Sequence, residues 1–437
     1  MSGTQRGVTV LHLCLSCPPE WSGGAAIFAF RLGAAQTADG MRVHYLCSSS
    51  DSELLPGEFL VEDRPEGHVT RVGAGLSKAG HAVRATTKRR LRALLHEQSV
   101  DIVHVHVITE LLRPLYSVAR EEGVPFIVTL HDGAWICANY FFEHSITRHL
   151  CQSYGLVRCL SCRSFELTRG SRAVEYPRRI LSAAASVVRT QIRYRPLLER
   201  MDRIVSCCEY VGNQYRALGV RHPITAVNNL VPYDEPAFPR VRSVHSPLRI
   251  GVMGGFREHK GGDIILGAVQ RLRDRFFEFV LDVWGPSPES HSDVARMVPL
   301  NAPVVFHGYY ERDQLGAILG EMDVMIHAST WDSYSTVVLE ALAARVPVIA
   351  VRETGTVEIV TDGINGFLFG RHDMDDLSAV VRRVLDNPER LADMRRAMRP
   401  PAPYRNMVDA YAALYSETVG LSTGQALHVC PSVGEAE

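Results

Sequence analysis

The sequence lacks several features that would assign it at once to a familiar class. It has no apolar run of about 18 residues, which a transmembrane helix requires, and no low-complexity tract or short repeat. Lys and Arg number 47 against 48 Asp and Glu, a balance that argues against a dedicated nucleic-acid-binding protein. A hydrophobic content of 46% excludes a largely disordered chain. The sequence therefore predicts a globular protein, and 437 residues are enough for two or three domains.

The sequence also gives little indication of secretion. Residues Val8–Leu15 have the length of a signal-peptide core, but His12 interrupts them and no small-residue cleavage site follows. We interpret this run as a first buried strand. Ten cysteines in a chain of this length are few, so we expect reduced thiols and a cytoplasmic location.

The charge balance hides an asymmetry between the two halves. Residues 1–232 hold 27 Lys and Arg against 20 Asp and Glu, whereas residues 233–437 hold 20 against 28. This predicts two domains that have different partners or that face each other. Basic residues crowd 88–92 and 169–203, either as solvated helix faces or as a surface for anionic lipid or an acidic acceptor. The second interpretation would place the protein peripherally at the inner membrane face.

Short β-branched runs alternate with helical patterns along both halves, which is typical of βαβ units. The expected strands are Val8–Leu15, Val43–Cys47, Asp101–Val107, Pro125–Leu130, Arg203–Cys207, Ile224–Asn228, Leu248–Met253, Phe277–Val283, Val304–His307, Val324–His327 and Val346–Val351. The expected helices are Ala25–Ala38, Ser77–Glu97, Leu111–Glu122, Ala173–Arg200, Tyr210–Leu218, Lys260–Arg273, Asp313–Leu319, Thr336–Ala344, Asp375–Leu385 and Tyr404–Val419.

The alternation predicts two doubly wound, Rossmann-like α/β domains in tandem. The domains are residues 1–232, with a cysteine-rich insert at 137–162, and 247–403; a linker at 233–246, a helix at 404–419 and a disordered tail at 420–437 complete the chain. Ligands of such folds bind beyond the carboxyl ends of the strands, and the cleft between two facing domains is the expected site.

Two glycine-rich loops follow the first strand of each domain. Gly23 and Gly24 open a helix, where glycine lets a ligand approach the backbone and the helix N-terminus attracts an anion. In the second loop, Arg257 and Lys260 accompany Gly255, a combination that suits a diphosphate. Neither loop has the G-x-G-x-x-G spacing of dinucleotide-binding folds. Plain βα turns remain the alternative for both loops.

Three acidic or histidine motifs complete the candidate polar groups. His131-Asp132 ends a strand, which is where ligand contacts occur in parallel sheets. Asp332 in a loop and Glu340 on the following helix can bracket the hydroxyls of a sugar or ribose, although Asp332 could also be a helix cap. We interpret His104 and His106, which lie inside a strand, as packed or hydrogen-bonded residues.

Four cysteines form a C-x13-C-x7-C-x2-C cluster: Cys137, Cys151, Cys159 and Cys162. The terminal CxxC has the spacing of a metal knuckle, and four thiolates suit structural Zn. Free thiols and disulfides remain open, and His144 and His149 are alternative ligands.

Taken in order, these motifs resemble the retaining, nucleotide-sugar-dependent glycosyltransferases of family 4, which have the GT-B fold. The series covers about residues 8–418: Gly23-Gly24, Leu130-His131-Asp132, Gly254…Lys260-Gly261, Asp332-x7-Glu340-Ala341, Pro347-Val348 and Asp362-Gly-Ile-Asn-Gly-Phe-Leu368. The run from Val304 to Phe369 is the most specific. Departures from the family pattern are Asp332 in place of Glu, Gly255 in place of Arg, Arg345 in place of Gly and Asn229 in place of Gly.

The resemblance implies a role for each motif residue. Gly23 and Gly24 would line the cleft near the donor phosphates and the acceptor, and His131 would contact the donor sugar. Asp332 would bind the donor-sugar hydroxyls and Glu340 those of the ribose. Lys260, with Gly255 and Arg257 nearby, would bind the diphosphate together with the amides of Ser335, Thr336 and Val337.

The resemblance also implies transfer of a hexose or amino-hexose, with retention, from a nucleoside diphosphate sugar to a hydroxyl of a small natural product or glycan. The enzyme would need no catalytic cofactor and no nucleic-acid partner, and structural Zn is the single metal considered. The alternatives are a GT-B phosphorylase, an inverting transferase and a non-catalytic nucleotide-sugar-binding protein. A dinucleotide-dependent oxidoreductase is disfavoured by the lack of G-x-G-x-x-G.

Overall fold

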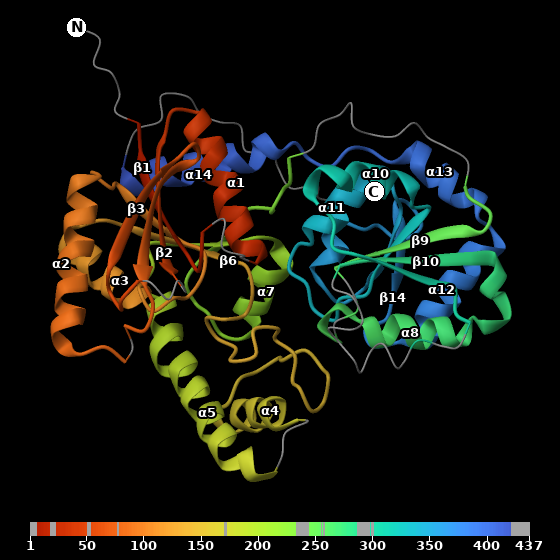
Figure 1. Ribbon diagram of the computed structural model, residues 1–437, viewed down its shortest axis with the longest axis horizontal. Helices are drawn as coiled ribbons and strands as arrows, with labels where there is room; N and C mark the ends of the chain where they lie inside the picture. Colours follow the sequence, from red (N-terminus) through yellow and green to blue (C-terminus); the bar gives the residue numbers. More distant parts are fainter. Residues whose placement is uncertain are drawn as a thin grey trace, which may run out of the picture. The chain divides into compact units, whose positions relative to one another are not determined.

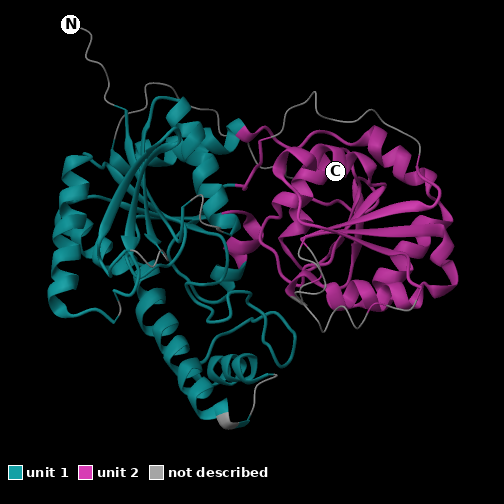
Figure 2. Cartoon of the chain, in the orientation of Figure 1, with its two compact units in different colours: residues 1–206, 214–227, 405–437 teal, residues 207–213, 228–404 magenta. Residues whose placement is uncertain are grey.

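The chain divides into two compact units, which Figure 2 distinguishes by colour. Unit 1 comprises residues 1–206, 214–227 and 405–437, and unit 2 comprises residues 207–213 and 228–404. The computed structural model describes residues 7–17, 23–49, 54–76, 78–169, 173–232, 244–254, 256, 258–285, 298 and 301–420. Gly255, Arg257, most of the expected linker and all but the first residue of the expected tail lie outside the described residues.

Unit 1 is built on an eight-stranded sheet in the order β3-β4-β2-β1-β5-β6-β7-β8 (Figure 1). The strands are β1 (Thr9–Cys14), β2 (Arg42–Ser49), β3 (Phe59–Arg64), β4 (Gly67–Gly73), β5 (Ile102–Val105), β6 (Phe126–Leu130), β7 (Arg203–Ser206) and β8 (Ile224–Ala226). All pairings are parallel except that of β3 with β4. Every residue of β1, β5 and β6 is buried, as expected for central strands covered on both faces.

The helices of unit 1 connect these strands and cover the sheet. They are α1 (Gly24–Ala38), α2 (His81–Glu97), α3 (Leu112–Glu121), α4 (Leu156–Thr168), α5 (Tyr176–Val188), a π-helix η2 (Arg189–Tyr194), α6 (Arg195–Leu198), α7 (Glu209–Ala217), which continues from unit 2, and α14 (Tyr404–Val419). Helices α4 and α5 pack on each other and project from the sheet layers of unit 1 (Figure 1).

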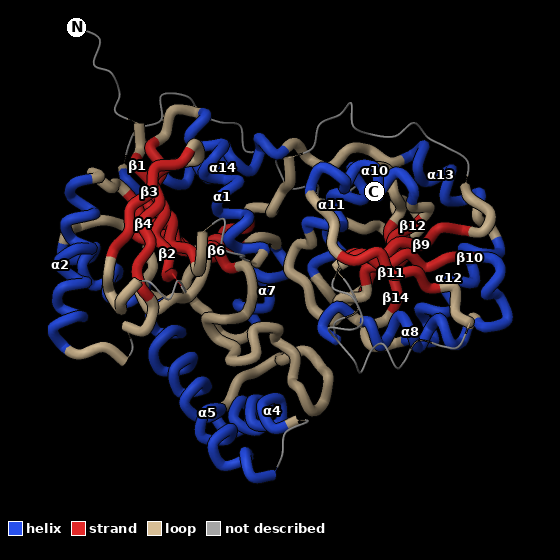
Figure 3. The backbone as a smooth tube through the Cα atoms, viewed as in Figure 1, coloured by secondary structure: helices blue, strands red, loops and turns tan. Residues whose placement is uncertain are grey.

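Unit 2 is a six-stranded parallel sheet in the order β11-β10-β9-β12-β13-β14. Its strands are β9 (Leu248–Met253), β10 (Phe279–Trp284), β11 (Val304–Gly308), β12 (Val324–His327), β13 (Val348–Val351) and β14 (Gly366–Phe369). Its helices are α8 (Gly262–Arg271), α10 (Leu315–Glu321), α11 (Thr336–Ala343), α12 (Met374–Asp386) and α13 (Glu389–Ala397). Figure 3 shows the strands of each unit enclosed by helices, which is the doubly wound arrangement predicted above.

The predicted strands recur within a few residues of the observed ones, and three strands went unpredicted. Strands β3 and β4 form an edge hairpin in which exposed and half-buried residues alternate along β3. Charged residues on an edge strand weaken the apolar signal on which the prediction relied. Strand β14 is only four residues long, and the sequence around it was recognised as a family motif rather than as a strand.

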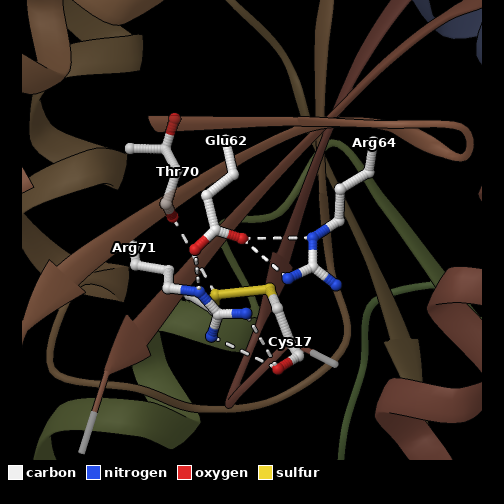
Figure 4. The surroundings of a disulfide bond; sticks show 6 residues. Cys17, Glu62, Arg64, Thr70 and Arg71 are labelled. Atoms are coloured by element: carbon white, nitrogen blue, oxygen red, sulfur yellow. Dashed lines mark hydrogen bonds and ion pairs between the residues drawn. A yellow bond between two sulfur atoms is a disulfide. The ribbon is translucent and has the colours of Figure 1, made fainter. Parts of the chain in front are cut away.

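One pair of cysteines corrects the expectation of reduced thiols. Cys17 and Cys47 form a disulfide at the carboxyl ends of β1 and β2, with their Cα atoms 6.4 Å apart (Figure 4). The guanidinium of Arg71 donates two hydrogen bonds of 3.2 Å to the carbonyl of Cys17, and Glu62 pairs with Arg71. The other cysteines within the described residues are free.

None of the helices in the described part of the chain is both long and apolar enough to span a bilayer.

Candidate functional site

In unit 2, two loops meet beyond the carboxyl ends of β9 and β12. The first loop leads from β9 to α8 and carries Lys260; the second leads from β12 to α11 and carries Asp332. Gly261 has a φ of 73°, and a Cβ there would lie 2.1 Å from the carbonyl oxygen of Ala328. Only glycine permits both this conformation and this approach. The absence of a side chain at Gly261 therefore allows the two loops to pack closely.

This packing brings Lys260 to Asp332. The Lys260 Nζ lies 3.6 Å from Asp332 Oδ2, and His327 Nε2 donates a hydrogen bond of 3.1 Å to the same oxygen. Burial would raise the pKa of Asp332, but the charge of Lys260 and the His327 hydrogen bond outweigh it and lower the pKa to about 2. Asp332 is therefore a carboxylate throughout the physiological range, able to accept hydrogen bonds from hydroxyls.

The N-terminus of α11 lies directly after this loop. Ser335 is its N-cap residue but makes no side-chain capping bond, and the first backbone bond runs from Leu339 N to Ser335 O. The amides of Thr336 and Val337 thus precede the first residue that donates within the helix. Nearby, the buried Ser329 hydroxyl has no partner among the described residues. Amides without a partner inside the helix and the helix dipole make this end of α11 suitable for an anion.

Glu340 lies one turn further along α11, at 10% side-chain exposure, and forms an ion pair with Arg312. Asp332 and Glu340 pair with different cations, Lys260 and Arg312 respectively. The sequence analysis missed Arg312 and His327. His327 ends a strand, which is the signal that selected His131, but Arg312 lies in a short 3-10 segment without a motif.

In unit 1, His131 ends β6 and lines a cavity of about 480 Å³. Asp132, Trp135, Tyr140, Arg189 and Tyr194 are among the other lining residues. Burial lowers the pKa of His131 to about 3, so its imidazole is neutral, and burial raises the pKa of Asp132 to about 6.

Gly23 and Gly24 begin α1 in unit 1. No described atom lies within 4 Å of the position that a Cβ would take at either glycine, and Gly23 has ordinary extended dihedral angles. Internal packing among the described residues therefore does not require these glycines. The open space beside them agrees with a backbone approached by a ligand.

A chain of buried side chains leads from His131 into the sheet of unit 1. His131 Nε2 is 3.3 Å from His106 Nδ1, and His106 Nε2 is 2.9 Å from His12 Nδ1. His12 Nε2 is in turn 2.9 Å from the amide oxygen of Gln36. The sequence analysis passed over His12 as a strand residue and did not consider Gln36.

The chain continues to helix α14. Gln36 Nε2 donates to the Tyr415 hydroxyl at 3.3 Å, which is 2.6 Å from His104 Nδ1. His104 Nε2 is 2.7 Å from the Thr129 hydroxyl, and this hydroxyl is 2.9 Å from that of Tyr411. The interpretation of His104 and His106 as hydrogen-bonded residues is confirmed, although only His104 lies within β5 and His106 directly follows its last residue.

The side-chain amide of Gln36 determines which nitrogen donates and which accepts in each of these hydrogen bonds. Its oxygen must accept from His12 Nε2, so His12 Nδ1 accepts from His106 Nε2 and His106 Nδ1 accepts from His131 Nε2. His131 therefore carries its proton on Nε2, and its Nδ1 is left with a lone pair. A neutral imidazole in this tautomer can accept a hydrogen bond from a hydroxyl.

The ring nitrogens of His12, His104 and His106 lie within 4.8 Å of one another, as metal ligands would. Every one of these nitrogens nevertheless has a hydrogen-bond partner. Burial lowers the pKa of each imidazole well below its usual range. We therefore interpret the cluster as a neutral hydrogen-bonded chain.

The four clustered cysteines lie between β6 and the end of α4. Cys159 and Cys162 share a face of α4, and the Cys162 sulfur accepts from the Ser145 amide at 3.3 Å and from Asn139 Nδ2 at 3.1 Å. Burial raises the pKa of Cys137 to about 12, with smaller contributions from the nearby Cys151 and Cys162. Among the described residues no three of these four thiols have their sulfurs within 4.8 Å of one another, as ligands of one metal would. Two N–H donors point at the Cys162 sulfur.

Comparison with known proteins agrees with this architecture. The model of the family described as Glycosyltransferase Family 4 matches residues 22–235, and the model described as Glycosyl transferases group 1 matches residues 235–400. Glycogen synthase of Mycobacterium tuberculosis (strain CDC 1551 / Oshkosh) is 26% identical over 410 residues, which are 89% of each chain. D-inositol 3-phosphate glycosyltransferase of Kribbella flavida is 26% identical over 43% of this chain and 47% of that protein.

Solved structures share the fold. Sucrose-phosphate synthase from Thermosynechococcus elongatus superposes with a TM-score of 0.64 at 15% identity, covering 94% of this chain and 99% of that one. Anabaena HepE in complex with UDP and glucose gives a TM-score of 0.59 at 15% identity, covering 94% and 99%. Two parallel-sheet α/β units, two consecutive family matches and these neighbours lead to one conclusion: the chain belongs to the family 4 glycosyltransferases and has the GT-B fold.

Proposed function

We propose that the protein transfers a hexose or amino-hexose from a nucleoside diphosphate sugar to a hydroxyl acceptor with retention of configuration. The observation that carries the proposal is the junction in unit 2 of Lys260, Asp332 and the uncapped N-terminus of α11. A cation, a set of unpaired amides and a carboxylate that stays ionised are what a diphosphate with an attached sugar requires.

In the proposed reaction the bond between the anomeric carbon and the diphosphate oxygen breaks. Negative charge develops on the departing oxygen, where Lys260 and the α11 amides stabilise it. The acceptor oxygen attacks from the same face, and its proton passes to the departing diphosphate. Atoms and charge therefore balance without a nucleophile from the protein, and the same-face attack retains the configuration.

The other site residues would hold the sugar. Asp332 would accept hydrogen bonds from donor-sugar hydroxyls. Glu340 would accept them from the ribose hydroxyls through a carboxylate oxygen that its ion pair with Arg312 leaves accessible. His131 would accept a hydrogen bond from one hydroxyl at Nδ1, because its tautomer leaves that nitrogen unprotonated. Gly23 and Gly24 would let the ligand approach the start of α1, and Gly255 and Arg257 remain predicted contacts.

A thermal-shift panel of UDP, GDP, ADP, dTDP, CMP and NAD tests the proposal. A ligand that binds only the folded protein raises the melting temperature by mass action. We expect one nucleoside diphosphate to raise it selectively and so to identify the donor base. If no nucleotide shifts the melting temperature, a phosphorylase or a degenerate binding protein takes the place of the transferase.

We also propose that Cys137, Cys151, Cys159 and Cys162 hold one structural Zn. The terminal CxxC spacing and the N–H donors at the Cys162 sulfur support this, since thiolate ligands are stabilised by such bonds. No three of these sulfurs, all on described residues, lie within metal-ligand distance of one another, so Zn binding would draw them together. Zn would fix the loop that follows His131 and thereby the wall of the neighbouring cavity.

Metal analysis of the purified chain gives the corresponding prediction. We expect about one Zn per chain in the wild type and its loss in Cys162→Ser, with a lower melting temperature. Cys207→Ser is the matched control, because Cys207 is another buried free cysteine outside the cluster. A wild-type chain purified without chelator that contains no Zn would show the cysteines to be free thiols.

A further inference from the structure

A second cavity in unit 1, of about 850 Å³, is strongly basic. It is bounded by α2, α3 and the π-helix η2, and five cations line it: Arg84, Lys88, Arg113, Arg189 and Arg193. Glu110 is the one acidic residue that lines it, and its carboxylate accepts a hydrogen bond of 2.7 Å from the Gly75 amide. Within the described part of unit 1, cations therefore outnumber acidic residues in the lining of this cavity by five to one.

These cations differ from the basic residues around them. Among the described residues, none of the five forms an ion pair, although Lys88 donates to Ser117 at 3.2 Å. By contrast, Arg92 on α2 pairs with Glu121 and Glu122, and Arg120 on α3 pairs with Asp202. Unpaired cations from three helices facing one cavity repel one another and concentrate anions there. All five side chains are exposed, yet they converge on one cavity from three helices, which the solvation of separate helix faces does not require.

The basic cavity adjoins the cavity beside His131. Leu15, Ile108, Arg189 and Tyr194 line both. A ligand could therefore place an anionic group among the cations and a hydroxyl near His131 at the same time.

We propose that this basic cavity, hereafter the anion cavity, binds a phosphate monoester carried by the sugar acceptor. The proposal rests on the transferase function above and adds the chemical class of its acceptor. A phosphate monoester carries close to two negative charges and three acceptor oxygens at neutral pH. Arginine binds such a group through two parallel hydrogen bonds, and the third oxygen and second charge of the phosphate can engage a further cation.

The three lysines of the chain provide a test that does not depend on turnover. Lys78, Lys88 and Lys260 are the only lysines, so mass spectrometry after brief acetylation reports each one separately. Lys88 lies in the anion cavity, Lys260 in the proposed donor site, and exposed Lys78 in neither. Saturating nucleoside diphosphate, chosen by the thermal-shift panel, is present so that phosphate does not occupy the donor site.

We expect inorganic phosphate and D-inositol 3-phosphate to slow acetylation of Lys88 and to leave Lys78 unchanged, whereas free inositol protects neither. Arg113→Gln and Arg193→Gln should weaken this protection about ten- to hundredfold, as the loss of a charged hydrogen bond does. The matched control is Arg120→Gln, which removes the same charge from the same helix as Arg113 but from a residue paired with Asp202.

Two further arms distinguish the source of the phosphate. Protection by the free monoesters indicates a soluble acceptor; protection only by vesicles of phosphatidylcholine with phosphatidic acid indicates a lipid-borne one. Equal protection of Lys88 and Lys78, or equal effects of Arg113→Gln and Arg120→Gln, would overturn the proposal. If the proposed donor site were wrong, nucleoside diphosphate would not slow the acetylation of Lys260, and this result is separate from the protection of Lys88.

Discussion

The Lys260→Ala variant is expected to lose about 100- to 1,000-fold in kcat/KM for glycosyl transfer, the usual effect of removing one group that stabilises a developing oxyanion. Two causes act together. The departing diphosphate loses its cation, and Asp332 becomes a buried carboxylate without the charge that now lowers its pKa. Steady-state kinetics with the donor identified by the thermal-shift panel measures the loss.

A second substitution separates these causes. The double variant Lys260→Ala/Asp332→Asn also removes the carboxylate that Lys260→Ala leaves without its cation. The gain in kcat/KM of the double variant over Lys260→Ala measures how strongly that carboxylate repels the diphosphate. The control is Lys78→Ala, which removes the same side chain from an exposed site in unit 1. Wild-type kcat/KM in Lys260→Ala would mean that Lys260 does not contact the diphosphate.

Acid is expected to destabilise unit 1 steeply below pH 6.5. Burial holds the pKa of His12 and His44 at about 4 and that of His131 at about 3, and it lowers the pKa of His104 and His106 well below the usual range. Between pH 6.5 and about 4 the unfolded chain therefore binds up to five protons that the folded chain does not. Each such proton lowers the free energy of unfolding by about 1.4 kcal/mol per pH unit.

Asp132 opposes one of these protons. Burial raises the pKa of Asp132 to about 6 from its usual value of 3.8. Between these two pH values Asp132 is protonated in the folded chain and ionised in the unfolded chain, so it stabilises the folded chain as the pH falls. The net effect is about four protons, or about 5.5 kcal/mol per pH unit between pH 5.5 and 4.5. Because domains have only about 5–15 kcal/mol of stability, unit 1 should unfold near pH 5 at room temperature.

Scanning calorimetry from pH 7.5 to 5 measures this dependence. The transition of unit 1 is the one that a nucleoside diphosphate does not move. His12→Gln should reduce the pH dependence of that transition by about one proton, whereas His245→Gln, a substitution in unit 2, should leave it unchanged. If the melting temperature did not change between pH 6.5 and 5, the buried imidazoles of unit 1 would bind protons equally in the folded and unfolded states, and burial would not lower their pKa values.

The sequence predicted best what local patterns determine. Buried parallel strands read as continuous β-branched runs, and this placed β1, β6, β9 and β12 within about two residues. The loops that end these strands contain the site, so Lys260, Asp332 and His131 followed from the strand assignments and the family motifs. Lys260 was also distinctive as the one lysine of the second half of the chain.

The remainder depends on contacts between distant residues. Nothing in the local sequence joins Gln36 to Tyr415, which are 379 residues apart, or His104 to the same tyrosine. The anion cavity likewise combines α2, α3 and η2, whose basic residues are individually typical of solvated helices. The pairing of Glu340 with Arg312 and the disulfide of Cys17 with Cys47 were invisible for the same reason.

Isothermal titration calorimetry with a nucleoside diphosphate and the matching monophosphate tests the central claim most directly. If Lys260 and the N-terminus of α11 bind the diphosphate, the diphosphate should bind the wild type about ten- to hundredfold more tightly than the monophosphate. This preference should largely disappear in Lys260→Ala and persist in Lys78→Ala. Equal affinity of the wild type for the two nucleotides, or a preference that Lys260→Ala retains, would contradict the account.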